Sequence, residues 1–304
     1  MSYTSRVKED ILAYKQATPP LLSAFLKLSA SIGITQEGLR LSVMTESRRL
    51  ASYIAEALKD LYQLEVVFSS YQKTNLSKNT TYKLDVVTDV DELLHRLHLA
   101  DFIFALDTGI PVGFFTSDQD KQDYLCGAFL ASGTIKDPDN GKYQLELTST
   151  YQDFAQGLMA LMQTFLLDAK IMERPKGSVV YLQRAEDILD FLLVIGATKT
   201  RDEYENVKVL RETRNNLNRA TNAEAANITR TITASLKIIQ AIETLDDKLG
   251  LENLPLDLQE VARMRLAHPD YSIQEIANNL AAPITKSGVN HRLRKLQKMA
   301  DELN

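Results

Sequence analysis

Hydrophobic residues follow two different periods within residues 1–200. Apolar and polar side chains alternate around Leu39, Leu41 and Val43, which predicts a β-strand, because successive side chains of a strand point to opposite faces. A second alternation predicts another strand around Tyr143, Leu145 and Leu147. The stretch Glu46–Leu64 predicts an amphipathic helix, because its apolar residues are three or four positions apart. These residues are Leu50, Tyr53, Ile54, Ala57, Leu58 and Leu61.

Four sequence blocks recur in the same order within this region. The recurrence predicts an internal duplication, with repeat one over residues 1–105 and repeat two over 121–200. Each repeat reads as a helix, a strand, a further strand region, a helix, more strand and a short helix. The paired blocks are Leu22–Ile32 with Leu125–Ile135, Leu39–Thr45 with Tyr143–Ser149, Leu50–Leu61 with Phe154–Phe165, and Tyr82–Leu94 with Ser178–Leu189.

Turn-forming residues separate these elements. The stretch Leu106–Asp123 contains Gly109, Pro111 and Gly113, and it predicts a connector between the repeats. Asp137–Gly141 predicts a turn between a helix and a strand.

Small side chains interrupt the first apolar helix of each repeat. They favour close packing of the two helices against each other about a pseudo-two-fold axis, since bulky residues would keep the backbones apart. The alternative is that each helix is an ordinary core helix that faces a sheet. The small residues are Ser23, Ala24, Ser29 and Ala30 in repeat one, and Cys126, Gly127, Ser132 and Gly133 in repeat two.

The remainder of the chain reads as helical. Glu203–Leu249 is long and polar, and we expect a helical linker over residues 201–250. Residues 251–304 then predict three helices. The first is Leu256–Ala267, the second follows a capping box from Ser272 to Glu275, and the third, Lys286–Leu303, follows Thr285. Two short helices, a tight turn and a longer basic helix are the layout of a helix-turn-helix.

The last helix divides into two faces when it is wound at about 100° per residue. Val289, Leu293, Leu296 and Ala300 form an apolar stripe, and the opposite side is polar and basic. We expect Ser287, Asn290 and His291 to read base edges, with Gly288 allowing close approach, while the cations contact phosphates. The alternative is a solvated helix face. The full predicted DNA-binding set is Lys286, Ser287, Gly288, Asn290, His291, Arg292, Arg294, Lys295 and Lys298.

Composition and charge narrow the class of protein. The chain has 304 residues, a net charge of −5 and one cysteine, which excludes a disulfide framework and a cysteine-built zinc site. No apolar run reaches the roughly 20 residues of a membrane span, so we expect a cytoplasmic protein without membrane contact. The four histidines, His95, His98, His268 and His291, are dispersed, and no phosphate-binding loop motif is present. We therefore expect neither a metal site nor a cofactor.

Three segments resemble known families. Leu125–Gly133 resembles the LAGLIDADG motif of homing endonucleases, in which two such helices pack at the centre of a saddle. Lys286–Lys295 resembles the helix-turn-helix of the WhiA family of bacterial regulators, and Asn215–Asn227 resembles that family's linker. The resemblance covers essentially the whole chain. It implies an α+β fold in which a duplicated LAGLIDADG-like saddle, with two αββαββα repeats, precedes an all-α helix-turn-helix domain.

The sequence departs from the nuclease pattern at one decisive position in each repeat. Homing endonucleases of this family carry an acidic residue at the penultimate motif position, where two carboxylates hold divalent cations. Ser29 and Ser132 occupy those positions here, and a neutral hydroxyl does not supply that charge. The degenerate positions predict a saddle without catalytic residues.

These observations favour a sequence-specific transcriptional regulator that binds the double-stranded DNA of promoters and associates with the nucleoid. The WhiA resemblance implies control of cell division, chromosome segregation or sporulation genes. A single helix-turn-helix gives weak binding, so we expect assistance from RNA polymerase or another regulator. Two alternatives remain: a protein-interaction or ligand-sensing module that uses the saddle, and a metal-dependent endonuclease with substituted ligands.

Overall fold

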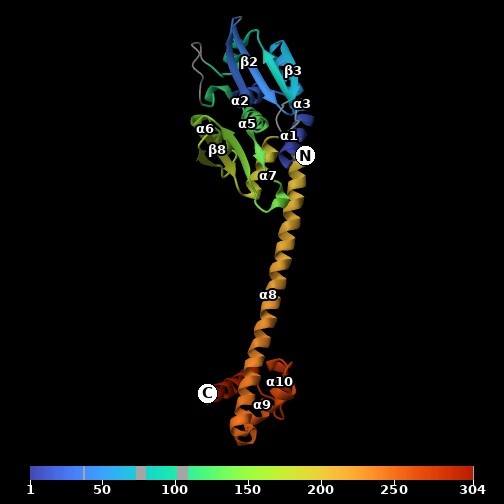
Figure 1. Cartoon of the computed structure of the whole chain (residues 1–304), viewed down its shortest axis with the longest axis vertical. Coiled ribbons are helices and arrows are strands. Elements are labelled where there is room, and N and C mark those ends of the chain that lie inside the picture. Colours follow the sequence, from blue (N-terminus) through green and yellow to red (C-terminus); the bar gives the residue numbers. More distant parts are fainter. Residues whose placement is uncertain (37, 73–79, 101–108, 304) are drawn as a thin grey trace. The chain divides into compact units, whose positions relative to one another are not determined.

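The computed structural model describes residues 1–36, 38–72, 80–100 and 109–303 (Figure 1). The predicted end of repeat one, at residue 105, and the first three residues of the predicted connector lie outside these ranges. The helices are α1 (Tyr3–Tyr14), α2 (Pro19–Ser29), α3 (Arg48–Tyr62), α4 (Val90–Arg96), α5 (Asp118–Ser132), α6 (Gln152–Gln163), α7 (Ala185–Val194), α8 (Thr198–Leu249), α9 (Leu256–Ala267), α10 (Ile273–Asn279) and α11 (Lys286–Asp301). The strands are β1 (Ala30–Thr35), β2 (Gly38–Thr45), β3 (Val66–Gln72), β4 (Thr80–Val86), β5 (Thr134–Ile135), β6 (Leu145–Ser149), β7 (Lys170–Arg174) and β8 (Gly177–Leu182). Short 3₁₀ turns occur at Val112–Phe114, Pro138–Asn140 and Leu251–Asn253.

The chain divides into two compact units, Met1–Glu212 and Thr213–Asn304. Each unit has its own hydrophobic core. The long helix α8 contributes residues to both units. Among the described residues, no helix is both long and apolar enough to cross a bilayer.

The first unit contains the predicted duplication. Its two halves run α2-β1-β2-α3-β3-β4-α4 and α5-β5-β6-α6-β7-β8-α7, so each is an αββαββα repeat. The two antiparallel sheets have matching strand orders, β1-β2-β4-β3 and β5-β6-β8-β7. Equivalent residues even pair in the same register: Leu41 lies opposite Ile32 and Val86, and its counterpart Leu145 lies opposite Ile135 and Leu182.

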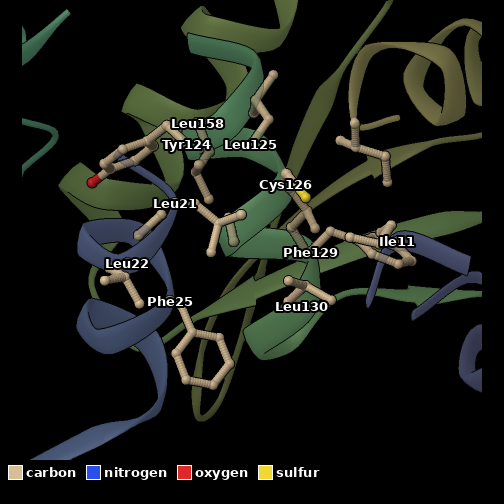
Figure 2. Packing of buried hydrophobic residues seen from close by; sticks show 14 of the residues in the cluster. Ile11, Leu21, Leu22, Phe25, Tyr124, Leu125, Cys126, Phe129, Leu130 and Leu158 are labelled. Carbon is tan, nitrogen blue, oxygen red and sulfur yellow. The ribbon is translucent and has the colours of Figure 1, made fainter. Parts of the chain in front are cut away.

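The two small-residue helices pack against each other, as predicted. A side chain at Gly127 of α5 would place its Cβ 2.0 Å from the carbonyl oxygen of Leu21 in α2, so only glycine allows this approach. Figure 2 shows the two helices with Leu21 and Leu22 on α2 and Leu125 and Cys126 on α5. All four side chains are buried. The alternative, in which each helix only faces a sheet, is therefore wrong.

Three local predictions need correction. The helix expected over Glu46–Leu64 is α3, Arg48–Tyr62, and Leu61 on its predicted apolar stripe is 37% exposed. The predicted connector ends too late, because α5 begins at Asp118; the side chains of Ser117 and Asp120 cap that helix end reciprocally. The turn at Asp137–Gly141 joins two strands, β5 and β6, because the two-residue strand β5 follows α5 directly.

One helix of the first unit was not predicted from the sequence. α1 buries Val7 and Ile11 in the core. Its Asp10 carboxylate accepts hydrogen bonds from the Thr200 backbone N–H (2.8 Å) and hydroxyl (3.0 Å), at the start of α8. The Tyr3 hydroxyl donates to the carbonyl oxygen of the same threonine (2.6 Å). These bonds fix α1 to the first turn of α8 within this unit.

Candidate nucleic-acid interface

The second unit contains the last part of α8 followed by α9, α10 and α11, and α10 begins with the predicted capping box. The backbone N–H of Glu275 donates to the Ser272 hydroxyl (3.2 Å), and the Ser272 N–H donates to the Glu275 carboxylate (2.7 Å). Hydrogen bonding from the Ser272 side chain and backbone N–H to the Glu275 carboxylate holds the pKa of that carboxyl below its usual value. The reciprocal cap sets the first residue of α10.

A tight turn then leads into α11. The Thr285 hydroxyl accepts from the backbone N–H of Gly288 (3.1 Å) and so caps α11, as predicted. The Ile284 N–H donates to the Ala277 carbonyl oxygen (3.2 Å), which ties the turn back to α10. The turn is therefore held at both ends by local hydrogen bonds, and it fixes where α11 starts relative to α10.

The apolar side of α11 faces the core, as the winding predicted. Val289, Leu293, Leu296 and Ala300 are all buried. Their core includes side chains from α9 and α10, and also from the last part of α8, which the sequence had assigned to a linker. The contributing residues are Leu258, Val261 and Ala262 of α9, Ile276 and Ala277 of α10, and Ala241, Ile242 and Leu245 of α8.

The opposite side of α11 is exposed and basic. The exposed members of the predicted set are Lys286, Ser287, His291, Arg294, Lys295 and Lys298. Within the described residues, Lys286, Arg294 and Lys295 form no ion pair, while Lys298 lies 3.7 Å from the exposed carboxylate of Glu302. This face presents cations, a hydroxyl and an imidazole to solvent, which are the groups that contact phosphates and base edges.

Three members of the predicted set lie differently. Arg292 is half-buried, and its guanidinium Nε lies 3.5 Å from the Asp257 carboxylate of α9. Asn290 and Gly288 are also half-buried. A Cβ at Gly288 would lie 3.3 Å from Cδ1 of Ile284, so the glycine leaves room for that side chain in the turn.

A buried arginine was missed by the sequence reasoning about function. Arg265 of α9 is only 3% exposed, and its guanidinium donates to the carbonyl oxygens of Tyr271 (2.7 Å) and Pro269 (3.2 Å). Burial lowers the pKa of this guanidinium. Arg265 thus fixes the loop that leads to Ser272 and α10. The available signal was its position on the apolar stripe of Leu256–Ala267.

The two degenerate positions of the duplicated domain, Ser29 and Ser132, supply no charged ligand for a metal ion. Ser29 and Ser132 lie at the carboxyl ends of α2 and α5. The Ser29 hydroxyl donates to the Phe25 carbonyl oxygen (2.6 Å), and the Ser132 hydroxyl accepts from the Thr148 backbone N–H (3.2 Å). Within the described ranges, no group of three or more His, Cys, Asp or Glu side chains could hold a metal ion. Neutral hydroxyls bonded to backbone do not fit the divalent cations that LAGLIDADG nucleases use.

Three family models match consecutive parts of the chain. A WhiA N-terminal LAGLIDADG-like domain matches residues 16–100, a WhiA LAGLIDADG-like domain matches 121–214, and a WhiA C-terminal helix-turn-helix domain matches 217–300. Two relatives, each called probable cell division protein WhiA, are 55% identical to this chain. The one from Streptococcus pneumoniae is covered over 100% of both chains, and the one from Streptococcus suis over 100% of this chain and 99% of its own.

A solved structure has the same fold. Full-length DUF199/WhiA from Thermatoga maritima matches 99% of this chain and 98% of its own, with a TM-score of 0.58 and 22% sequence identity. Fold and sequence together define a protein with a duplicated LAGLIDADG-like domain and a C-terminal helix-turn-helix domain. The chain belongs to the WhiA family.

Proposed function

We propose that this protein is a sequence-specific, DNA-binding transcriptional regulator that reads promoter DNA with α11. The observation that carries the proposal is the division of α11 into a buried apolar stripe and an exposed face with three cations that no carboxylate neutralises within the described residues. Such a face supports insertion into the major groove, since the phosphates attract the cations while short polar side chains reach the bases.

The predicted contacts are divided by their position along α11. Ser287, Asn290 and His291, near its amino end, would read bases. Lys286, Arg294, Lys295 and Lys298 would contact phosphates. Arg292 differs because its Nε lies beside the Asp257 carboxylate, which partly neutralises its charge, so we expect it to contribute less to phosphate binding.

The relatives' name supports a role in cell division. In this proposal the controlled genes act in cell division, chromosome segregation or sporulation. In this proposal residues 251–304 read DNA, and residues 201–250 link them to the duplicated domain. Residues 1–200 form a scaffold without nuclease activity, because serines replace the metal-binding acids. Promoter binding would associate the protein with the nucleoid. The scaffold would hold RNA polymerase or another regulator that supplements one helix-turn-helix.

The test is selection of duplexes of roughly 40 base pairs, about four helical turns, from a random pool by the full chain. We expect a defined motif to be enriched. For that duplex, Arg294→Ala/Lys295→Ala should raise the dissociation constant at least about tenfold and reduce the slope of log K against log salt by about 1.8.

The matched control is Lys59→Ala/Lys176→Ala, which removes two exposed cations from the duplicated domain. It should leave both quantities near their original values. Enrichment of no motif, or unchanged binding by the α11 variant, would overturn the proposal.

A further inference from the structure

The central part of α8 is an exposed helix with an unusual composition. Every residue from 212 to 234 is exposed. Within Thr213–Ala234, ten of 22 residues are asparagine or threonine, which are poor helix formers because their side chains or branching favour other conformations. Poor helix formers that make no tertiary contacts lower the stability of the helix. A function outside the helix, such as binding a partner, would explain their presence in this segment.

Five of these ten side chains lie on one face of the helix. At about 100° per residue, Asn215, Asn218 and Asn222 lie within about 60° of one another. Within the same third of the circumference, further residues continue the stripe toward the core of the second unit. We call this set the amide face: Asn215, Asn218, Arg219, Asn222, Thr229, Arg230, Thr233 and Lys237.

Three of the four cations of this segment, all but Arg214, lie on the amide face. The amide face holds three cations and no carboxylate. The only acidic residue between Thr213 and Lys237 is Glu224, on the opposite side with Leu217 and Ile228. The same helix behaves differently just before this segment, where Arg201 and Lys208 pair with carboxylates and Arg211 binds the carbonyl oxygen of Gly141 (2.9 Å).

Most polar side chains of the amide face have hydrogen-bonding groups that are available to bind a ligand. Within the described residues, its asparagine side chains make no hydrogen bond, and its three cations make no ion pair. The Thr229 hydroxyl is the exception, since it donates to the Ala225 carbonyl oxygen (2.9 Å) of its own helix. Asparagine and arginine side chains are among those that contact DNA bases and phosphates in protein–DNA complexes.

The spacing of the cations fits duplex DNA. Arg219 and Arg230 are 11 residues apart, about three turns, so they project from the same side at a separation of about 16 Å. That distance reaches phosphates on both sides of a major groove about 12 Å wide. The segment also belongs to the same compact unit as α11, Thr213–Asn304.

We propose that the amide face of α8 is a second DNA-contacting surface, which binds duplex DNA flanking the site that α11 reads. The inference rests on the proposed function and adds a DNA-contacting surface outside the three helices α9, α10 and α11. Arg219, Arg230 and Lys237 bind phosphates, and the three asparagines hydrogen-bond to phosphate oxygens or base edges between them.

The experiment measures the dissociation constant and its salt dependence with the full chain and two duplexes of equal length, one selected and one unselected. Arg219→Gln/Arg230→Gln should weaken binding to both duplexes about tenfold and reduce the salt slope by about 1.8. Asn215→Ala/Asn218→Ala/Asn222→Ala should weaken binding about tenfold with the slope unchanged. Alanine is the best helix former, so loss of helix would not explain that result.

The matched control is Leu217→Ala/Ile228→Ala on the opposite side of the same helix, which should bind both duplexes normally. If the α11 variant loses binding while both amide-face variants keep the original constants and slopes, the inference is overturned and the proposed function stands. If amide-face variants change the sedimentation coefficient but not DNA binding, the face holds a second copy of the chain, and the inference is again overturned. If the α11 variant binds normally, the proposed function fails whatever the amide face does.

Discussion

Among single residues, Gly127 determines how closely the two central helices of the duplicated domain approach, because glycine has no side chain. The α2–α5 contact brings the Leu21 carbonyl oxygen to the surface of α5 at Gly127, a position where no Cβ fits. Cys126 beside it is fully buried, and burial raises the pKa of its thiol to about 12. The thiol is therefore neutral and acts as a small apolar side chain in this contact.

We predict that Gly127→Ala destabilises the first unit by about 3 kcal/mol, because a Cβ 2.0 Å from a backbone oxygen forces the two helices apart. Differential scanning calorimetry of the full chain should show a lower melting temperature for one transition only. Gly33→Ala is the control, since a Cβ there meets nothing within 4 Å. Equal melting temperatures for both variants would contradict the tight contact.

At the scale of elements, caps determine where the helices of the second unit begin. Ser272 and Glu275 satisfy each other's backbone N–H groups at the start of α10, and Thr285 does the same for one N–H of α11. The orientation of the exposed face of α11 depends on both starting points, since each additional residue rotates a helix by about 100°.

We predict that Ser272→Ala destabilises the second unit by about 1 kcal/mol through loss of the cap.

The contribution of Glu275 should depend on pH. Its folded pKa lies below the unfolded value, so its stabilisation is present above the unfolded pKa, about 4.3, and is lost as pH falls through the folded pKa.

Urea unfolding of the second unit, followed between pH 7 and pH 3, checks this sign. Glu275→Gln should lose less stability on acidification than the original protein does. An equal loss in both proteins would show that other carboxylates account for the acid dependence.

At the scale of the whole molecule, one continuous helix joins two units with separate cores. Its central residues have no buried contacts to stabilise them, so local opening there requires little free energy compared with opening of either core. The exposed segment contains three arginines, Arg214, Arg219 and Arg230.

We predict that brief trypsin treatment cuts first at these arginines and leaves two folded fragments, which mass spectrometry and circular dichroism would identify. Arg214→Gln/Arg219→Gln/Arg230→Gln, which keeps helix propensity, should delay the cut. First cuts within residues 1–200 would show instead that the duplicated domain opens more easily. Protection of the segment by the selected duplex would support the amide face as a DNA surface.

Patterns within a single element were predictable from the sequence. The apolar stripe of α11, the Ser272 cap and the strand alternation at Leu41 and Val43 each depend on neighbours within one or two turns. The helix α1 was missed, although Val7 and Ile11 are buried, because the contacts that fix it come from Thr200, distant in the sequence. The partner of Arg292 was missed for the same reason, since Asp257 lies on another helix.

Local sequence patterns predicted the duplication, the helix-turn-helix and the outward cations of α11, because periodicity and capping act over short distances. The tertiary structure alone decided that the end of α8 belongs to the core of the second unit, that Gly127 meets the Leu21 carbonyl oxygen, and that Arg265 fixes the loop before α10. These features require residues far apart in the sequence to occupy adjacent space, and no local pattern encodes which of them will meet.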